Sequence, residues 1–190
     1  LYTAPTFVML FSLVLFHEKM TKTKGIVLGM TFVGCVLVTG MLQGDTHLTG
    51  AGILIGLAAG VGYALYSIFG TYAIRAGYGS LSISFYSFLT ATVCMAFLVE
   101  PRAVFSRITE MRQWPLAVSF ALLTTVVPYL CYTKGLSGLP ASRASVTATI
   151  EPVVAAVLGI AVFHESVTMM KVTGIVLVLA SVVLMNRQKD

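Results

Sequence analysis

A segment between Thr147 and Val178 repeats a segment near the start of the chain, and this duplication most constrains the fold. The matching positions are Pro5 and Pro152, His17-Glu18 and His164-Glu165, and, after a shift of two residues, Gly25 and Gly174. A fixed internal repeat indicates that one structural unit occurs twice. Each copy contains an apolar segment with a proline, a polar turn that opens with His-Glu, and a second apolar segment with a glycine near its start. The pattern predicts two copies of a helical hairpin.

The composition indicates that these hairpins lie in a lipid bilayer. Hydrophobic residues make up 57% of the chain and charged residues 10%, which is typical of a membrane protein. Long apolar stretches without strict alternation favour helices over barrel strands, because a helix satisfies its own backbone groups in hydrocarbon. We therefore expect an all-α, polytopic membrane protein with seven transmembrane helices. The predicted spans are residues 1–16, 25–41, 51–73, 82–99, 115–133, 142–163 and 171–186.

The duplication also predicts a longer protein in which the two halves have opposite orientations. Three spans precede the proline-containing span of the second copy, whereas none precedes that of the first. We therefore expect an N-terminally truncated chain that holds seven of ten helices. Residues 1–41 would form the C-terminal hairpin of the first repeat, and residues 50–187 a complete second repeat of five helices. An odd number of spans per repeat inverts the second repeat in the membrane.

Basic residues are scattered through short loops, so the sequence does not favour nucleic acid as a partner. We interpret them as topology signals. With the first turn in the cytoplasm, eight of the twelve Lys and Arg residues lie on the cytoplasmic side: Lys19, Lys22, Lys24, Arg75, Lys134, Arg143, Arg187 and Lys189. This count favours a multi-pass protein of the cell membrane with a cytoplasmic C-terminus, although three arginines within residues 100–112 disagree with it.

Glu151 gives the sharpest functional signal, because it lies near the middle of the span over residues 142–163 and directly before Pro152. A charge at the bilayer centre costs at least about 2.5 kcal/mol unless a partner or water meets it. The carboxylate either binds a substrate amine, carries a coupling proton, or is a purely structural group at the proline. The sequence leaves these alternatives open. The corresponding residue of the first copy is Ala4, so the duplication alone does not require an acid here.

Hydroxyl-bearing side chains in two other spans are candidates for the wall of a cavity. Tyr63 and Ser67 share a face of one span, and Tyr129 and Tyr132 follow Pro128 in another. Hydroxyls at membrane depth either bond to a neighbouring helix or line a wet cavity, and the sequence does not decide between these roles. The candidate substrate-binding residues are Glu151, Tyr63, Ser67, Tyr129 and Tyr132, and the expected helix kinks lie at Pro5, Pro128 and Pro152.

The remaining motifs are expected to have structural roles. Small residues recur every four positions at Gly52, Gly56, Gly60 and Ala64, which predicts a face that packs closely against a neighbouring helix. The turn motifs are His17, Glu18 and Gly25 in the first copy and His164, Glu165 and Gly174 in the second; the two glutamates are expected to cap the turns or to bridge helices. The histidines are too isolated to indicate a metal site. No catalytic constellation is evident at either membrane surface, so we expect neither an enzyme nor a cofactor.

A span with an interior proline, an acidic residue at its end, a short turn and a glycine opening the next span occurs at Pro5–Glu18 and Gly25, and again at Pro152–Glu165 and Gly174. This arrangement resembles the signature of the EamA domain in the drug/metabolite transporter superfamily. The resemblance implies ten helices in two inverted five-helix repeats, a central cavity, and export of small metabolites such as amino acids, or of drugs. It leaves open the substrate, the coupling ion and whether chains form a homo-oligomer.

The resulting hypothesis is alternating access, in which the two repeats rock in the lipid bilayer about a site near the midplane. Its expected partners are a small-molecule substrate and, in one of the alternatives for Glu151, a coupling proton. A seven-helix receptor is the rival suggested by the visible span count, but the duplication disfavours it. A channel also stays open as an alternative, because sequence does not separate a gated pore from a carrier.

Overall fold

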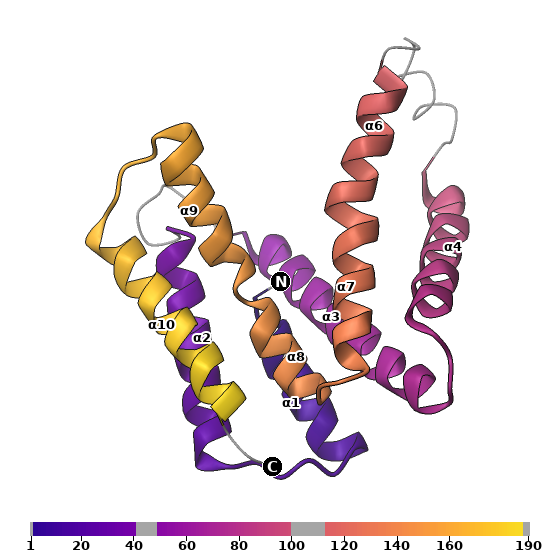
Figure 1. Cartoon of the computed structure of the whole chain (residues 1–190), viewed down its shortest axis with the longest axis horizontal. Helices are drawn as coiled ribbons and strands as arrows, with labels where there is room; N and C mark the ends of the chain where they lie inside the picture. The colour runs from indigo at the N-terminus through magenta and orange to yellow at the C-terminus, as the bar shows by residue number, and fades with distance from the viewer. Residues whose placement is uncertain (1, 41–48, 100–112, 188–190) are drawn as a thin grey trace. The chain divides into compact units, whose positions relative to one another are not determined.

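The computed structural model describes residues 2–40, 49–99 and 113–187, and Figure 1 traces the path of these residues. Most of them are helical and none of them forms a strand, which confirms the expected all-α class. The elements are α1 (Ala4–Leu15), α2 (Lys22–Val38), α3 (Gly50–Arg75), α4 (Ser80–Leu98), α6 (Gln113–Ala121), the π-helical segment η1 (Leu122–Val126), α7 (Val127–Leu136), α8 (Ala141–Ala148), α9 (Glu151–Phe163) and α10 (Met169–Arg187). The three arginines that disagreed with the predicted topology lie outside the described residues.

Each predicted span coincides with helical residues, but the helices differ in whether they could cross a bilayer. Among the described residues, five stretches are long and apolar enough: Gly50–Arg75, Ser80–Leu98, Trp114–Leu136, Ala141–Phe163 and Met169–Arg187. Helices α1 and α2 have 12 and 17 residues, whereas about 20 are needed to cross the hydrocarbon core. The chain is therefore a multi-span membrane protein, and the count of seven spans stays a prediction.

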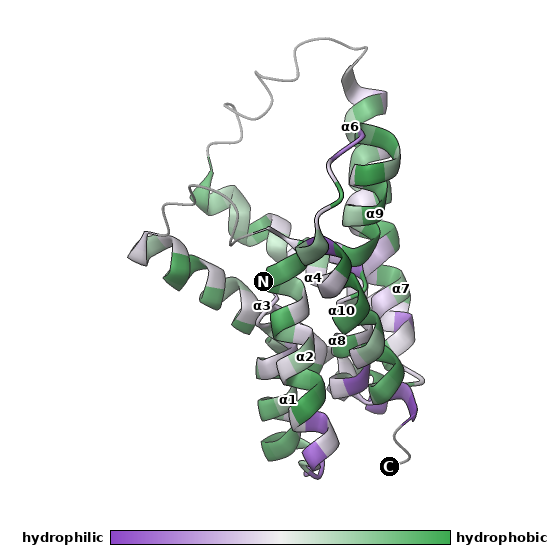
Figure 2. Cartoon of the chain, turned by 90° about the vertical axis from the view of Figure 1, so that its left-hand side faces the viewer, coloured by the Kyte–Doolittle hydropathy of each residue, from purple (hydrophilic) through white to green (hydrophobic). Residues whose placement is uncertain are grey.

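The helix surfaces are apolar, as expected of helices that face lipid. Figure 2 shows hydrophobic residues along every helix. Large apolar side chains are exposed on several of them, including Leu54 on α3, Phe97 on α4 and Phe120 on α6. A soluble protein rarely exposes so much continuous apolar surface. The exposed surface is thus consistent with a hydrocarbon environment.

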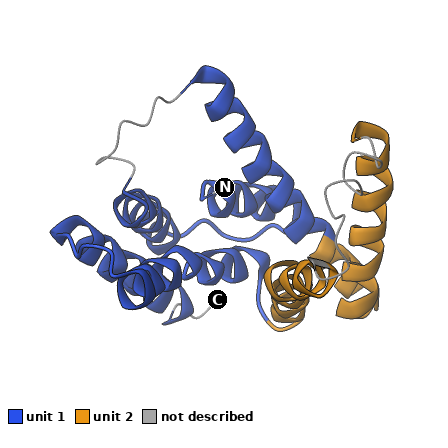
Figure 3. Ribbon diagram, turned by 90° about the horizontal axis from the view of Figure 1, so that it is seen from above, with its two compact units in different colours: residues 1–69, 139–190 blue, residues 70–138 orange. Residues whose placement is uncertain are grey.

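The chain divides into two compact units, which Figure 3 colours separately. The first unit comprises residues 1–69 and 139–190, and so contains α1, α2, most of α3, α8, α9 and α10. The second unit comprises residues 70–138, with the end of α3, α4, α6, η1 and α7. Both copies of the duplicated hairpin therefore belong to the first unit.

Helices α2 and α10 are tightly packed in the first unit and run antiparallel (Figure 1). A Cβ atom added to Gly174 would lie 2.8 Å from the carbonyl oxygen of Gly34, so the two backbones touch where the helices cross. Thr31 Oγ1 donates a buried hydrogen bond of 2.9 Å to Ser181 Oγ. From Thr31 to Gly34 along α2, the contacted residues on α10 run backwards from Ser181 to Gly174, so the two helices are antiparallel.

The span predicted over residues 142–163 is interrupted near its middle. Helix α8 ends at Ala148 and α9 begins at Glu151. Between them, the N–H groups of Thr149 and Ile150 donate to carbonyls three residues earlier instead of four. Pro152 follows directly and has no N–H to donate to the Ala148 carbonyl. The predicted kink at this proline is therefore a short interruption placed just before Glu151.

Pro5 lies at the corresponding position of the first copy, but it begins a helix. The described part of α1 starts at Ala4, so Pro5 lies in the first turn. In a first turn the missing N–H interrupts no helical hydrogen bond. The bend expected at Pro5 stays a prediction, because only residues 2 and 3 of the described chain precede this helix.

In the second unit, α4 packs against α7. Ser84 Oγ donates to Thr133 Oγ1 across this contact at 3.4 Å, and both side chains are buried. The rings of Phe88 and Tyr129 meet edge to face with centroids 5.4 Å apart. These contacts fix Tyr129, one of the predicted cavity residues, against α4.

A change of helix type directly precedes Pro128, where a bend is predicted. The preceding segment η1 has π-helical hydrogen bonding, and the N–H of Val127 donates to the carbonyl of Leu122, five residues earlier. Because Pro128 cannot donate to the Thr124 carbonyl, the regular α-helical pattern cannot continue through this point. π-helical segments occur often at functional sites, although they do not define one.

Candidate functional site

The two His-Glu turns have the same backbone structure. His17 and His164 are the described non-glycine residues with positive φ, at 55° and 54°. The next residue in each copy donates its N–H to a carbonyl six residues earlier, Glu18 to Ser12 and Glu165 to Gly159. A residue in the left-handed conformation is common at the end of a helix. The sequence identity of the turns thus extends to their conformation.

The side chains of the two turns also form matching contacts. Thr21 Oγ1 accepts from the N–H of Lys24 at 3.2 Å, and in the second copy Thr168 Oγ1 accepts from the N–H of Lys171 at 3.3 Å. The ammonium groups of the same lysines pair with the glutamates of their turns, at 3.0 Å and 2.8 Å. Each turn is therefore closed by a capped helix start and one ion pair. The sequence alone indicates only a topological role for these lysines.

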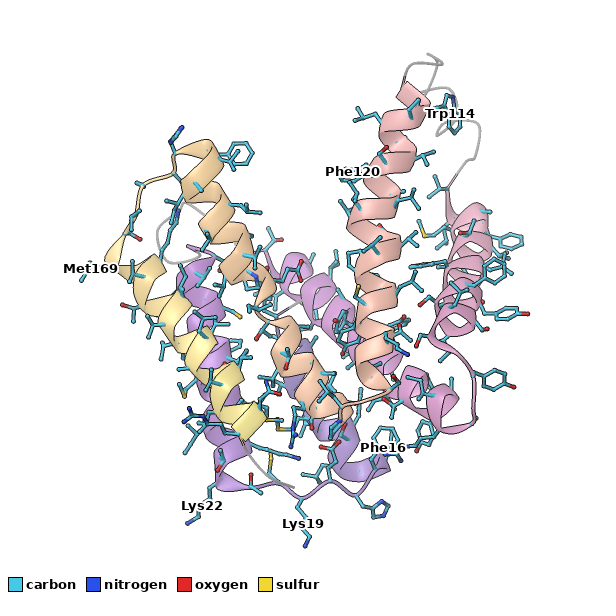
Figure 4. All side chains as sticks on the ribbon, viewed as in Figure 1. Phe16, Lys19, Lys22, Trp114, Phe120 and Met169 are labelled. Carbon is cyan, nitrogen blue, oxygen red and sulfur yellow. The ribbon has the colours of Figure 1, made fainter. Side chains whose placement is uncertain are left out.

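One contact distinguishes the two turns. The Glu18 carboxylate also accepts a hydrogen bond from Ser142 Oγ, at the start of α8. The side chain of Glu18 is 18% exposed and that of Glu165 is 52% exposed. The first turn is thus tied to the interrupted helix, whereas the second is closer to solvent or lipid headgroups. Figure 4 shows Lys19 and Lys22 of the first turn at the opposite end of the α2–α10 pair from Met169, which follows the second turn.

A small cavity of about 30 Å³ lies in the first unit beside the interruption between α8 and α9. Its walls come from the start of α1, the middle of α3 and the α8–α9 junction. The lining residues are Tyr2, Ala4, Pro5, Tyr63, Ser145, Ala148, Thr149 and Glu151. Two predicted site residues, Glu151 and Tyr63, therefore line the same cavity.

Equivalent positions of the two copies meet in this cavity. The offset that relates Pro5 to Pro152 also relates Tyr2 to Thr149 and Ala4 to Glu151. Both members of the last two pairs line the cavity. Tyr2, Ser145 and Thr149 were missed from sequence. Extending the repeat alignment three residues before each proline would have identified Tyr2 and Thr149.

Three polar groups of the cavity, at Ser145, Thr149 and Glu151, offer acceptors, and Tyr2 and Tyr63 add two phenol groups. Ser145 Oγ donates to the Ser142 carbonyl at 2.9 Å, and Thr149 Oγ1 donates to the Val146 carbonyl at 2.6 Å. Both hydroxyl protons are thus used within α8, and only lone pairs remain for a ligand. An ionised Glu151 carboxylate is also an acceptor alone. Among the described residues, no basic side chain forms an ion pair with Glu151.

The other predicted site residues lie outside this cavity. Ser67 is fully buried one turn further along α3, and its hydroxyl donates to the Tyr63 carbonyl at 3.0 Å. Tyr129 and Tyr132 belong to α7 of the second unit. Within the described residues, no cluster of three or more His, Cys, Asp or Glu side chains could hold a metal ion.

A larger and mainly apolar cavity of about 390 Å³ lies between α1, α2 and α3. It is lined by Tyr2, Thr3, Phe32, Cys35, Val36, Thr39, Gly52, Ile53, Gly56 and Leu57. Tyr2 lines both cavities. The predicted small-residue face of α3 therefore has two different environments. Gly60 packs against Thr3, because a Cβ atom added to Gly60 would lie 2.6 Å from Thr3 Oγ1. A Cβ atom added to Gly56 would have no neighbour within 4 Å, and Gly56 lines the larger cavity.

The sequence is similar to those of known membrane transporter families. Residues 50–187 match the profile of the EamA-like transporter family. An uncharacterized transporter of Archaeoglobus fulgidus is 28% identical, with 99% of this chain and 65% of the relative aligned. An uncharacterized transporter of Synechocystis sp. is 25% identical, with 99% of this chain and 57% of the relative aligned. An uncharacterized transporter of Bacillus subtilis is 26% identical, with 96% of this chain and 58% of the relative aligned. The chain thus spans less than two thirds of their length. No solved structure matches it.

Proposed function

This chain belongs to the EamA-like transporter family, and from that premise we propose that it forms part of a membrane carrier that exports small metabolites, such as amino acids, or drugs. The carrier works by alternating access between two inverted five-helix repeats, and its C-terminus lies in the cytoplasm. The substrate crosses near the interrupted helix, where Glu151 either binds a substrate amine or carries a coupling proton. A pair of repeats of opposite orientation is a recurrent basis for such transport.

The observation that carries this proposal is the cavity where the two copies meet. Secondary transporters bind substrate at interrupted helices between their repeats, near the bilayer midplane. Here one cavity is lined by Thr149 of the interruption, by Glu151 after it, and by Tyr2, Ala4 and Pro5 of the first copy. A carboxylate that has no cationic partner among the described residues is costly in a membrane span. A bound cation or proton would remove that cost.

The matching turns and the antiparallel packing of α2 and α10 support the inverted arrangement. In an inverted repeat, equivalent helices run in opposite directions through the membrane. Helices α2 and α10 are equivalent by the duplication, and their contacts have this direction. The proposal therefore assigns the first and second turns to opposite membrane surfaces.

Flux through proteoliposomes tests the proposal. The intact protein is reconstituted, and uptake of a panel of amino acids and cationic drugs is measured with and without a pH gradient. We expect Glu151→Gln to abolish transport or its dependence on the pH gradient. Glu165→Gln removes the same charge from an exposed turn and should retain transport. Unchanged rate and pH dependence in Glu151→Gln would make this residue purely structural.

A further inference from the structure

We propose that the two neighbouring cavities bind a primary amine with an apolar body, the ammonium group in the small cavity and the apolar body in the larger one. This inference rests on the proposed function, because it takes the Glu151 cavity as part of the transport site. It adds the chemical class of the substrate, and it identifies Tyr2 as the residue at the boundary between the two subsites.

The small cavity selects a group that donates hydrogen bonds and carries positive charge. Its hydroxyls at Ser145 and Thr149 have given their protons to backbone carbonyls, so they offer lone pairs. The Glu151 carboxylate offers more acceptors and a negative charge. An ammonium group has three donors and no acceptor, which matches this set. A carboxylate or phosphate would meet the unfavourable negative charge of Glu151.

The volume of the small cavity limits the size of that group. A cavity needs at least about 10–15 Å³ of such volume to hold one water molecule. The cavity around Glu151 has about 30 Å³, so it accepts a primary ammonium group but not a quaternary one with four carbon substituents. The body of the ligand must therefore lie outside this cavity.

The larger cavity provides the place for that body. It is lined by Phe32, Val36 and Leu57 among other mainly apolar groups, and its volume of about 390 Å³ is within the usual range for small-molecule sites. Tyr2 lines both cavities, so a ligand that occupied both would contact this side chain between its ammonium group and its apolar body. An alkali ion would occupy only the small cavity and would gain no binding free energy from the apolar one.

Equilibrium binding to the purified intact protein tests the inference. The probes are methylammonium, butylammonium and hexylammonium chlorides at neutral pH, with hexanol, tetramethylammonium and sodium chloride as comparisons at constant ionic strength. Affinity should rise along the alkylammonium series by up to about fourfold for each methylene group that becomes buried. Hexanol lacks the charge and tetramethylammonium exceeds the small cavity, so both should bind far more weakly than hexylammonium.

Two pairs of variants assign the subsites. Glu151→Gln should weaken binding of every primary amine by about tenfold or more, because it removes a charged hydrogen-bond acceptor; Glu165→Gln should have no effect. Gly56→Leu places a side chain in the larger cavity and should weaken hexylammonium while leaving methylammonium unchanged. Gly62→Leu is the matched control, since Gly62 lies on the same helix, has no neighbour within 4 Å and lines neither cavity.

The inference is overturned if sodium competes as well as methylammonium while chain length has no effect, because the site would then hold a simple ion. It is also overturned if hexanol or tetramethylammonium binds as tightly as hexylammonium. Transport of other substrates without amine binding would contradict the inference and leave the proposed carrier intact. Amine binding without any flux would contradict the carrier and leave the binding sites intact.

Discussion

At the scale of single residues, Gly174 sets the distance between α2 and α10. Any Cβ atom there would lie 2.8 Å from the carbonyl oxygen of Gly34 and from the backbone N of Val38, and backbone atoms cannot move aside cheaply. Overpacking of this kind typically costs about 1–3 kcal/mol. We predict that Gly174→Ala lowers the thermal unfolding midpoint in detergent, measured by loss of helical circular dichroism.

Gly29→Ala is the matched control on the partner helix. No atom lies within 4 Å of its added Cβ, and alanine favours a helix over glycine by up to about 1 kcal/mol. The unfolding midpoint of this variant should stay unchanged or rise slightly. Equal losses in the two variants would mean that the helices do not cross at Gly174.

Residue-scale reasoning from sequence located part of the candidate site. Glu151 was evident because an acid in the middle of an apolar span is costly, and Tyr63 because it carries a hydroxyl in such a span. Ser67 was indistinguishable from Tyr63 by that criterion, yet it lies outside the cavity and bonds to its own helix. Tyr2 was missed, because a tyrosine near a helix start is usually an interfacial anchor.

At the scale of elements, the two turns should differ in stability although their sequences match. Glu18 and Lys24 form a largely buried pair with an added hydrogen bond from Ser142, whereas the Glu165 side chain is 52% exposed. Removing one partner of a fully buried pair costs about 3–5 kcal/mol, and an exposed pair contributes about 0–1 kcal/mol. We predict a larger loss of stability in Glu18→Gln than in Glu165→Gln.

Thermal unfolding of both variants in one detergent checks this prediction, and Ser142→Ala completes a double-mutant cycle with Glu18→Gln. The two effects should be non-additive, because Ser142→Ala removes the donor of this hydrogen bond and Glu18→Gln replaces its charged acceptor with a neutral one. Additive effects, or equal losses in the two glutamate variants, would show that the contact between the first turn and α8 does not stabilise the protein.

The positions of the helices followed from the sequence, but their internal interruptions did not. Apolar periodicity and length predict where a helix runs, since they reflect burial in hydrocarbon. Proline predicts a lost hydrogen bond, yet the response differs at each site: a helix start at Pro5, a π-helical segment before Pro128 and a short interruption before Pro152. These responses depend on contacts with other helices, which local sequence does not contain.

At the scale of the whole molecule, the account depends on the two copies having opposite orientations in the membrane. Their turns share a left-handed histidine, a capping threonine and a lysine–glutamate pair. Within the first unit these turns lie at opposite ends of the antiparallel helices α2 and α10 (Figure 4). In carriers built from inverted repeats, such equivalent elements lie at both membrane surfaces.

Cysteine accessibility in intact cells tests this arrangement most directly. In a background that lacks Cys35, Cys94 and Cys131, a single cysteine is introduced by Lys19→Cys in the first turn or by Val167→Cys in the second; both positions are exposed. A membrane-impermeant maleimide should label the second variant from outside, and the first only after the membrane is opened. Labelling of both variants from the same side would contradict the inverted repeats and the carrier built on them.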